Sequence, residues 1–248
     1  MRKVTALLVC VALCRAVGAQ SIAEQPARFA VATIKPSAAD AAPVTQFRGN
    51  RFASEGTTFV DLFKYAYNVH PDQVVGGPEW LRTKKFDVLA DPETEKRPSS
   101  DQMKALVRQL LAERFHVVMH QEQKVLPVYA LVKTPDAPKL KKSTADPSGI
   151  PVAGYSPTGE LQVGNATMGD FVRFLQRFVL DRPAVDQTGI EGKFDLVLKW
   201  TPDGVAGDAA APPSLFTAVR EQLGLKLQAV KAKTDVFVVE RAEMPAEN

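Results

Sequence analysis

The sequence predicts an α+β protein made of two related halves, each with the order β-α-β-β-α-β-β and with helices packed on mixed or antiparallel sheets. One observation is a repeat, because the Lys-Phe-Asp sequence at 85–87 recurs 108 positions later at 193–195. Another is that alternating segments, typical of strands, are interleaved with segments whose apolar residues have helical spacing. The repeat indicates an internal duplication.

A capping box predicts the first helix of each half. The Thr58 hydroxyl and the Asp61 carboxylate, three residues apart, satisfy free amides at a helix start, and apolar residues follow at helical spacing. The same pair recurs as Thr167 and Asp170, so a matching helix is expected in the second half.

The remaining elements follow from periodicity and from turn residues. Residues 28–35 alternate and are expected to form a strand that stops at Pro36. Each half is predicted to close with a hairpin, 116–121 with 128–133 and 225–231 with 236–241. Further strands are expected around 52 and at 85–90 and 193–200, and second helices at 100–114 and 213–223.

Four segments are predicted along the chain. Residues 1–19 have Arg2 and Lys3 after the first methionine, then an apolar run too short to span a bilayer and a small-residue ending, which is typical of a secretory signal peptide. Residues 20–134 and 159–248 are the two halves. The Pro- and Lys-rich stretch 135–158 between them is expected to be a linker or a long surface loop. Periodicity leaves open whether the halves share one sheet.

Composition limits the possible functions. Both cysteines lie in the segment expected to be removed, so no disulfide or thiol chemistry is expected. The full chain has 31 Lys+Arg and 28 Asp+Glu, and three of the basic residues lie in the predicted signal peptide. The mature chain is then neutral, which gives no argument for a nucleic-acid partner. No later apolar run is long enough for a transmembrane segment. Location in the periplasm or outside the cell is expected.

No metal, cofactor or catalytic constellation is expected. His116 and His120 have the spacing of a helical metal pair, but they follow a predicted helix end and lie in a predicted strand. Four strand residues span about 13 Å, too far for two ligands of one zinc ion. The sequence has neither a Gly-x-Ser-x-Gly elbow nor a phosphate-binding glycine loop.

Carboxylates are the remaining candidates for acid-base chemistry. Asp61 and Asp170 have a structural role at helix starts. Asp87 and Asp195 occupy the same place in the two halves, and the alternation of their strands puts them on the less buried face. A secreted hydrolase using Asp87 or Asp195 is therefore an alternative, and a pair of such groups would have to lie within about 10 Å of each other.

Three aromatic residues are the candidate ligand-binding residues. Tyr65, Tyr67 and Trp80 flank the Gly-Gly-Pro turn at 76–78 and could grip a sugar, a peptide or a partner strand. The alternative is that Trp80 packs beneath the loop and that both tyrosines complete the apolar face of the first helix.

Several motifs carry a family resemblance: the strand at 29–35, the capped segment 58–67, Gly-Gly-Pro-Glu-Trp-Leu at 76–81, Leu-Pro-Val-Tyr-Ala-Leu at 126–131, and Lys-Phe-Asp at 193–195. On these, the chain resembles the exported "soil-associated protein" family of bacteria, a domain of unknown function. Each half also resembles the short amino-terminal domain of secretins and TonB-dependent receptors, with a second helix ending in Leu-Leu-Ala-Glu-Arg-Phe at 110–115.

These resemblances imply an extracytoplasmic contact or signalling module. Relatives of the first family are joined to membrane-bound sensor peptidases, which implies a sensory or binding role, and neither family brings a catalytic residue. The sequence thus favours an exported, non-catalytic binding or sensory module. Its partner would be an envelope protein or a peptide, bound at a sheet edge or at the aromatic turn. A structural envelope scaffold is a further alternative. Ligand identity and oligomeric state stay open.

Overall fold

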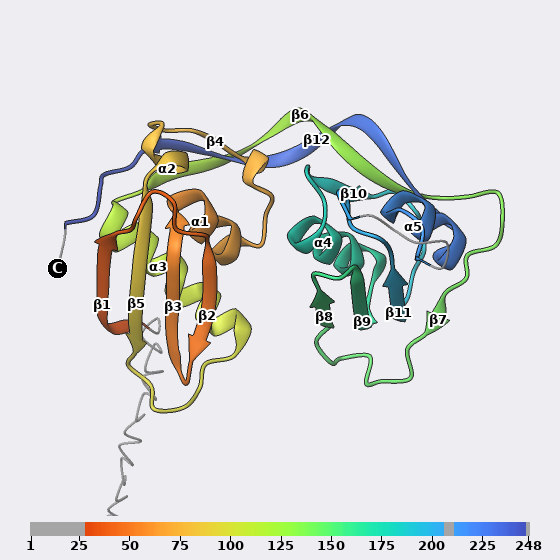
Figure 1. The fold of residues 1–248 in the computed structure, drawn as a ribbon, viewed down its shortest axis with the longest axis horizontal. Coiled ribbons are helices and arrows are strands. Elements are labelled where there is room, and N and C mark those ends of the chain that lie inside the picture. The colour runs from red at the N-terminus through yellow and green to blue at the C-terminus, as the bar shows by residue number, and fades with distance from the viewer. Residues whose placement is uncertain (1–27, 206–210, 247–248) are drawn as a thin grey trace, which may run out of the picture.

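The computed structural model describes residues 28–205 and 211–246, and the predicted signal peptide at 1–19 lies outside them. Two lobes are joined by a pair of long strands (Figure 1). Helices and strands combine in mixed and antiparallel sheets, which confirms the predicted α+β class. Among the described helices, none has the length and apolar character needed to cross a bilayer.

An antiparallel sheet backs the first lobe. Its order is β1-β5-β3-β2, from β1 (Phe29–Pro36), β5 (Lys85–Pro92), β3 (Arg51–Thr58) and β2 (Val44–Arg48). Two helices cover one face of it, α1 (Phe59–Tyr67) and α3 (Ser100–Phe115). The 3-10 turn η1 (Pro71–Gln73) and the short helix α2 (Trp80–Thr83) connect these elements. The predicted capping box is present, since Asp61 N donates to the Thr58 hydroxyl at 3.1 Å and Thr58 N donates to the Asp61 carboxylate at 2.9 Å.

The second lobe has the same layers. Its antiparallel sheet has the order β7-β11-β9-β8, from β7 (Lys141–Lys142), β11 (Phe194–Lys199), β9 (Glu160–Ala166) and β8 (Val152–Ser156). Helices α4 (Met168–Phe178) and α5 (Leu215–Leu223) belong to this lobe. The predicted capping box at Thr167 and Asp170 begins α4.

A third sheet is shared by both lobes. Strands β6 (Val118–Lys133) and β12 (Leu225–Arg241) pair antiparallel along almost their whole length. Short β4 (Val74–Gly76) adds parallel to β12 in the first lobe, and short β10 (Ala184–Asp186) adds parallel to β6 in the second. The two halves therefore share one sheet, of order β10-β6-β12-β4.

The predicted closing hairpins are wrong. The stretches between the paired segments, 122–127 and 232–235, contain neither glycine nor asparagine to turn the chain, and the strands run straight through them. Pro127 is tolerated within β6 because β10 pairs with that strand only from Tyr129 onward. Each predicted hairpin is one long strand, and its partner is the long strand of the other half.

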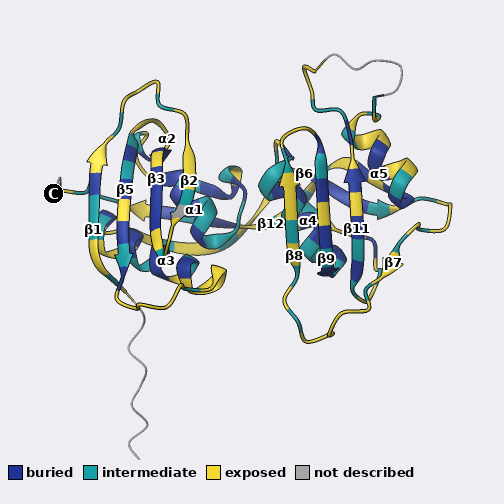
Figure 2. Cartoon of the chain, turned by 60° about the horizontal axis from the view of Figure 1, so that its bottom comes forward, coloured by how far each residue is buried: buried dark blue, intermediate teal, exposed yellow. Residues whose placement is uncertain are grey.

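Each long strand contributes to both hydrophobic cores. Phe237 and Val239 of β12 are buried in the core of the first lobe, although α5 and the start of β12 belong to the second. Tyr129 and Leu131 of β6 are buried in the core of the second lobe. In Figure 2 the buried faces of the helices turn toward these cores. Neither lobe has a complete core without a strand from the other.

The segment 135–158, expected as a linker or loop, contributes the edge strands β7 and β8. Strand β8 pairs with β9 through a short turn in which Gly159 N donates to Ser156 O at 3.0 Å. All prolines of this segment lie outside the two strands, so none of them removes an amide from the strand pairing.

Candidate functional site

A groove separates the two lobes beneath the long strands. Two adjoining cavities of about 270 and 500 Å³ form it, and Arg177 and Phe178 at the end of α4 line both of them. The smaller cavity reaches Thr45 of β2, and the larger one reaches Ala153 of β8. The groove thus extends from one lobe to the other and is the candidate functional site.

The walls of the groove come from corresponding positions of α1 and α4. These positions lie 109 residues apart, the interval that separates the capping residues Thr58 and Thr167. The pairs that line the two cavities are Asp61 and Asp170, Lys64 and Arg173, Tyr65 and Phe174, and Asn68 and Arg177. Because the two helices face each other, residues that correspond in sequence meet at one site.

Arg177 of α4 bridges the groove to the first lobe. Its guanidinium carbon lies 5.8 Å from the ring centre of Tyr65 on α1 and 5.1 Å from that of Phe178. Tyr155 of β8 stacks on the Phe178 ring, with centroids 5.2 Å apart. Burial lowers the pKa of Arg177, and the nearby Tyr65 partly offsets this shift. Aromatic faces hold a guanidinium by cation-π attraction, so Arg177 is fixed in position.

Two cations of the groove, Arg177 and Lys64, form no ion pair with an acid in the described part of the chain. Asp101 pairs with Lys104 at 3.1 Å, Asp170 pairs with Arg173, and the Asp61 carboxylate accepts hydrogen bonds from Thr58. Among the described residues, no ion pair joins an acid to Arg177 or Lys64. Burial lowers the pKa of the Lys64 ammonium, against the effect of Asp61, and Arg177 lowers it further. This part of the groove suits an anion.

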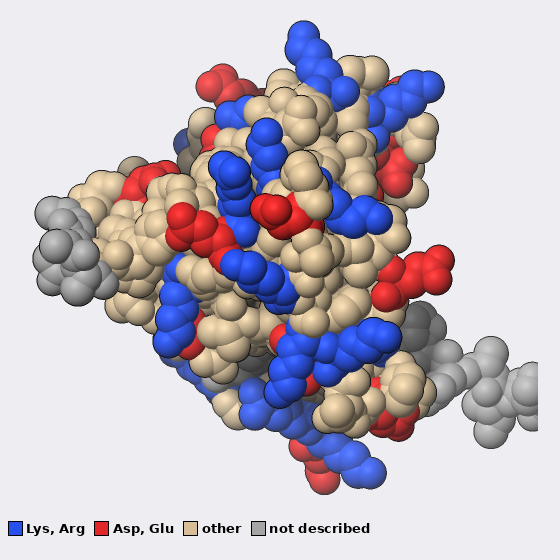
Figure 3. Space-filling view, turned by 90° about the vertical axis from the view of Figure 1, so that its right-hand side faces the viewer, with Lys and Arg blue, Asp and Glu red and all other residues tan. Residues whose placement is uncertain are grey.

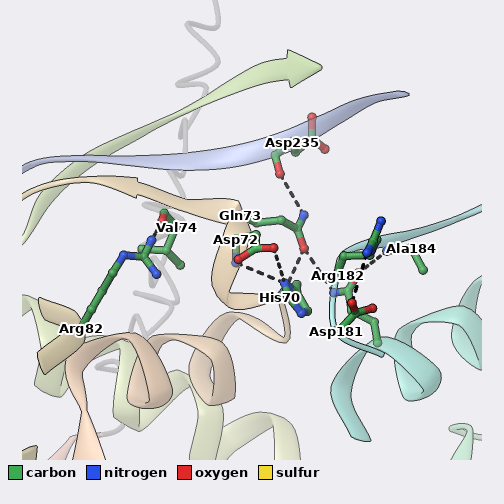
Figure 4. A network of polar contacts seen from close by, with 10 residues as sticks. His70, Asp72, Gln73, Val74, Arg82, Asp181, Arg182, Ala184 and Asp235 are labelled. Atoms are coloured by element: carbon green, nitrogen blue, oxygen red, sulfur yellow. Dashed lines mark hydrogen bonds and ion pairs between the residues drawn. The ribbon is translucent and has the colours of Figure 1, made fainter. Parts of the chain in front are cut away.

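A buried amide pair holds the lobes together on one side of the groove. Gln176 Nε2 of α4 donates to Gln73 Oε1 of η1 at 3.2 Å, and Gln73 Nε2 donates to the Asp235 carbonyl of β12 at 2.9 Å. Ala184 N donates to Gln176 Oε1 at 2.9 Å, which ties β10 to the pair (Figure 4). These bonds set the spacing of α1 and α4 across the groove.

His70 lies in the same network and is also buried. Its Nδ1 accepts from Asp72 N at 3.2 Å, and its backbone N donates to the Gln73 side chain at 2.9 Å (Figure 4). Burial lowers its pKa, and Lys64 acts in the same direction, whereas Asp72, a hydrogen bond with the Leu180 backbone and Asp181 raise it. The neutral imidazole is therefore the form that this contact between the lobes favours.

The three aromatic residues expected at a binding site do not form one patch. Tyr65 lines the groove. Tyr67 stacks on Phe63 with centroids 4.1 Å apart, and Trp80 packs edge-on to Phe59 at 6.3 Å. All three are partly buried against the core of the first lobe. Tyr67 and Trp80 thus have the packing role that the sequence offered as the alternative.

Asp87 and Asp195 lie on separate sheets and line separate surface hollows. The Asp87 carboxylate accepts from Gly56 N at 2.9 Å, and that of Asp195 accepts from Asn165 N at 3.0 Å. Both aspartates brace an irregularity in the pairing with the neighbouring strand. The hydrogen bond from the Asn165 backbone N–H lowers the pKa of Asp195 most, and a hydrogen bond from the Ser143 side chain lowers it further. The structure does not bring the two carboxylates together, and each has a structural role.

The histidines that follow α3 are exposed. His116 pairs with Glu243 at 3.4 Å and His120 with Glu240 at 2.6 Å, so each contacts an acid of the carboxyl-terminal segment. Within residues 28–205 and 211–246, no group of three or more His, Cys, Asp or Glu side chains is placed to hold a metal ion.

The outer end of the second lobe carries charges of both signs. Figure 3 shows lysine and arginine side chains there among aspartate and glutamate. The second lobe also has an exposed ion pair between Lys199 of β11 and Glu160 of β9, at 3.2 Å. Nucleic-acid surfaces typically present a patch of one sign, so this face gives no support to such a partner.

The fold and the groove define a two-lobed α+β protein with a cationic site between its lobes. The chain belongs to a family of proteins of unknown function, DUF3738, whose model matches residues 60–242. This supports the predicted membership of a domain family of unknown function, whereas the likenesses to soil-associated proteins and to secretins stay predictions. A search of curated proteins and a search of solved structures each found no match.

Proposed function

We propose that this chain is an exported, non-catalytic binding module and that its ligand, an anion, occupies the groove between the lobes. The observation that carries the proposal is Arg177, which is held between Tyr65 and Phe178 without an acidic partner among the described residues. Burying an uncompensated cation destabilises a protein, and a ligand that supplies the opposite charge removes that cost.

The choice of a carboxylate as the anion follows from the shape of the guanidinium. Its planar donors match a carboxylate in a two-pronged geometry, and Lys64 in the same cavity adds a second positive charge. Export is supported by the signal-like pattern of residues 1–19. The separation of Asp87 and Asp195 on different sheets favours binding over hydrolysis.

The test is an NMR titration of isotope-labelled residues 20–248 with N-acetylglutamate and with succinate. We expect chemical-shift changes at Arg177, Tyr65 and Phe174, and none with the uncharged amide N-acetylglutaminamide. Arg177→Gln should weaken binding at least tenfold. Arg220→Gln, at an exposed position of α5, is the matched control and should leave binding unchanged.

If none of the acids shifts the groove signals, or if Arg177→Gln binds as the wild type does, the proposed anion site is wrong. Unchanged spectra of the variant away from the groove will establish that the fold is intact.

A further inference from the structure

Two open sheet edges face the groove. Strand β2 ends the sheet of the first lobe and β8 ends that of the second. Figures 1 and 2 show these strands facing each other between the lobes. Each has five residues, whereas the edge strands β4 and β10 have three and β7 has two. At the other edge, β1, the Ala32 carbonyl already accepts from Arg114 at 2.8 Å.

The pairing registers indicate which backbone groups point into the groove. Two residues, Gly49 and Asn50, join β2 to β3, with Arg48 opposite Arg51. In such a hairpin the residues next to the turn bond to each other, and alternate residues then turn their N–H and C=O outward. By this alternation Thr45 turns its backbone to the open edge, and Thr45 does line the smaller cavity.

The same alternation applies to β8. Ser156 lies opposite Glu160 across a three-residue turn. Counting back from that pair, Ala153 turns its backbone to the open edge, and it lines the larger cavity. Ala153 follows Thr45 by 108 positions, so the two lobes present corresponding backbone groups to one groove.

Within residues 28–205 and 211–246, neither edge is covered by another element, and neither strand contains a proline. Natural edge strands are blunted by inward-pointing charges, by prolines within the strand or by a covering element. Strand β2 instead exposes Val44, and β8 exposes Val152. A peptide that pairs with β2 as an additional strand would point every second side chain toward α1 and α4, where Lys64 and Arg177 lie.

We infer that the ligand is an extended peptide that adds to β2 as a further strand, faces β8 on its other side, and directs an acidic side chain to Arg177 and Lys64. The inference rests on the proposed anion site and adds the class of ligand and its mode of binding. Main-chain hydrogen bonds supply affinity in strand addition, and side-chain pockets supply specificity. Charge complementarity selects acidic peptides here, because these two cations have no acid paired with them among the described residues.

The test begins with selection of random linear ten-residue peptides displayed on phage against immobilised residues 20–248, followed by synthesis of the enriched peptides. We expect each to contain Glu or Asp and to bind at least tenfold more weakly to Arg177→Gln. Thr45→Pro removes the outward N–H and should weaken binding at least tenfold, whereas Thr45→Ala, which keeps that N–H, should change it less than twofold. N-methylation of alternate peptide bonds should have the same effect as Thr45→Pro without altering the protein.

Three results would overturn the inference. Acidic peptides that bind equally well to Thr45→Pro and after N-methylation would leave the anion site in place and exclude strand addition. A selection that enriches no acidic peptide would exclude a peptide ligand, while the titration with small acids tests the anion site independently. Sedimentation that shows a wild-type dimer, converted to a monomer by Thr45→Pro, would assign the edges to self-association. Urea unfolding of each variant verifies that its fold is retained.

Discussion

The two lobes use the same polar contacts to fix the backbone but fill their cores differently. Lys85 donates to the carbonyls of Ala39 and Ala41 before β2, and Lys193 donates to the carbonyl of Gly149 before β8. The capping boxes of α1 and α4 correspond as well, and so do the hydrogen bonds that Asp87 and Asp195 accept from the neighbouring strand. The lobes therefore share a set of backbone-fixing side chains at corresponding positions.

The cores show the difference. In the first lobe six of the 20 described buried core residues are phenylalanines, and Phe115 contacts Phe59 at 5.4 Å and Phe86 at 5.5 Å. In the second, four of the 19 described buried core residues are aromatic, and leucine is the commonest residue. Apolar packing tolerates exchange of side chains when the volume is kept, whereas a cap or a brace needs one particular polar group. The backbone of both lobes is therefore specified by the same polar contacts, while the apolar side chains of the two cores differ.

The largest effect is expected when the two halves of the chain are produced separately. Residues 20–134 alone lack Phe237 and Val239, and residues 159–248 alone lack Tyr129 and Leu131, so neither half can complete its core. We expect neither half to show cooperative urea unfolding or a dispersed NMR spectrum.

The matched control is the intact protein cut at a protease site inserted after the exposed Thr144. Its two pieces should stay together, because β6 and β12 hold them by a long ladder of main-chain hydrogen bonds. A half that folds alone would mean that the crossing strands are not needed.

A smaller effect is expected from corresponding residues on the two long strands. Phe237, which packs against Phe63 at 5.2 Å and Tyr67 at 5.0 Å, is opposite β4. Tyr129, opposite β10, contacts the exposed Phe216. Phe237→Ala should lower the free energy of unfolding by about 3–5 kcal/mol. Tyr129→Ala should cost less, because its neighbour lies at the surface. Urea unfolding measures both, and equal losses would contradict the comparison.

The next effect is expected where Asp87 and Asp195 accept hydrogen bonds at shifts in the strand pairing. Gly56 has φ of +62°, and a Cβ there would lie 2.8 Å from the Ala42 carbonyl oxygen. Gly56→Ala should therefore destabilise the protein by about 2 kcal/mol. Asn165 has the corresponding position with φ of 52°, and its Nδ2 donates to the carbonyls of Asp146 and Gly149. Asn165→Gly loses these two bonds but relieves backbone strain, so a cost of about 1 kcal/mol is expected from thermal unfolding. A larger cost at Asn165 than at Gly56 would show that the loop contacts, rather than backbone strain, govern this position.

The smallest effect concerns the residues that end α3 and α5. His116 has φ of 45°, and Gly224, at the corresponding position, has φ of 64°. His116→Gly should stabilise the protein by about 0.5–1 kcal/mol, because glycine has no penalty in this conformation and the exposed contact with Glu243 contributes little. Gly224→Ala should destabilise, since a Cβ would lie 3.0 Å from the Ala137 carbonyl oxygen. Calorimetric midpoints measure both variants, and a loss of stability on His116→Gly would contradict the argument.

Local elements were predictable and their long-range pairing was not. Capping boxes and helical spacing identified α1 and α4, and the alternation of apolar residues identified β1 and β5. The same alternation continues through β6 and β12, but periodicity does not reveal which strand is the partner. A local hairpin is the simplest pairing to expect, and it was wrong here.

The groove could not be predicted for the same reason. Arg177 follows Asn68 by the interval of the repeat, which was visible in the sequence, but nothing local indicates that α1 and α4 face each other. Their approach depends on the crossing strands and on the Gln73–Gln176 contact, whose members are 103 residues apart. Of the predicted candidates, Tyr65 reaches the groove because it lies on the face of α1 that turns toward α4.

The crossing of β6 and β12 also fixes when the first lobe can become stable. Gln73 can donate its hydrogen bond to the Asp235 carbonyl, 162 positions later, only after that part of β12 has been synthesised. Strand β4 pairs with the same late part of β12. Contacts between distant parts of a chain slow folding, because a long loop must close before they form. During synthesis the first lobe therefore stays open while the whole second lobe is made. The core of the first lobe can therefore be completed only after nearly the whole chain has been synthesised.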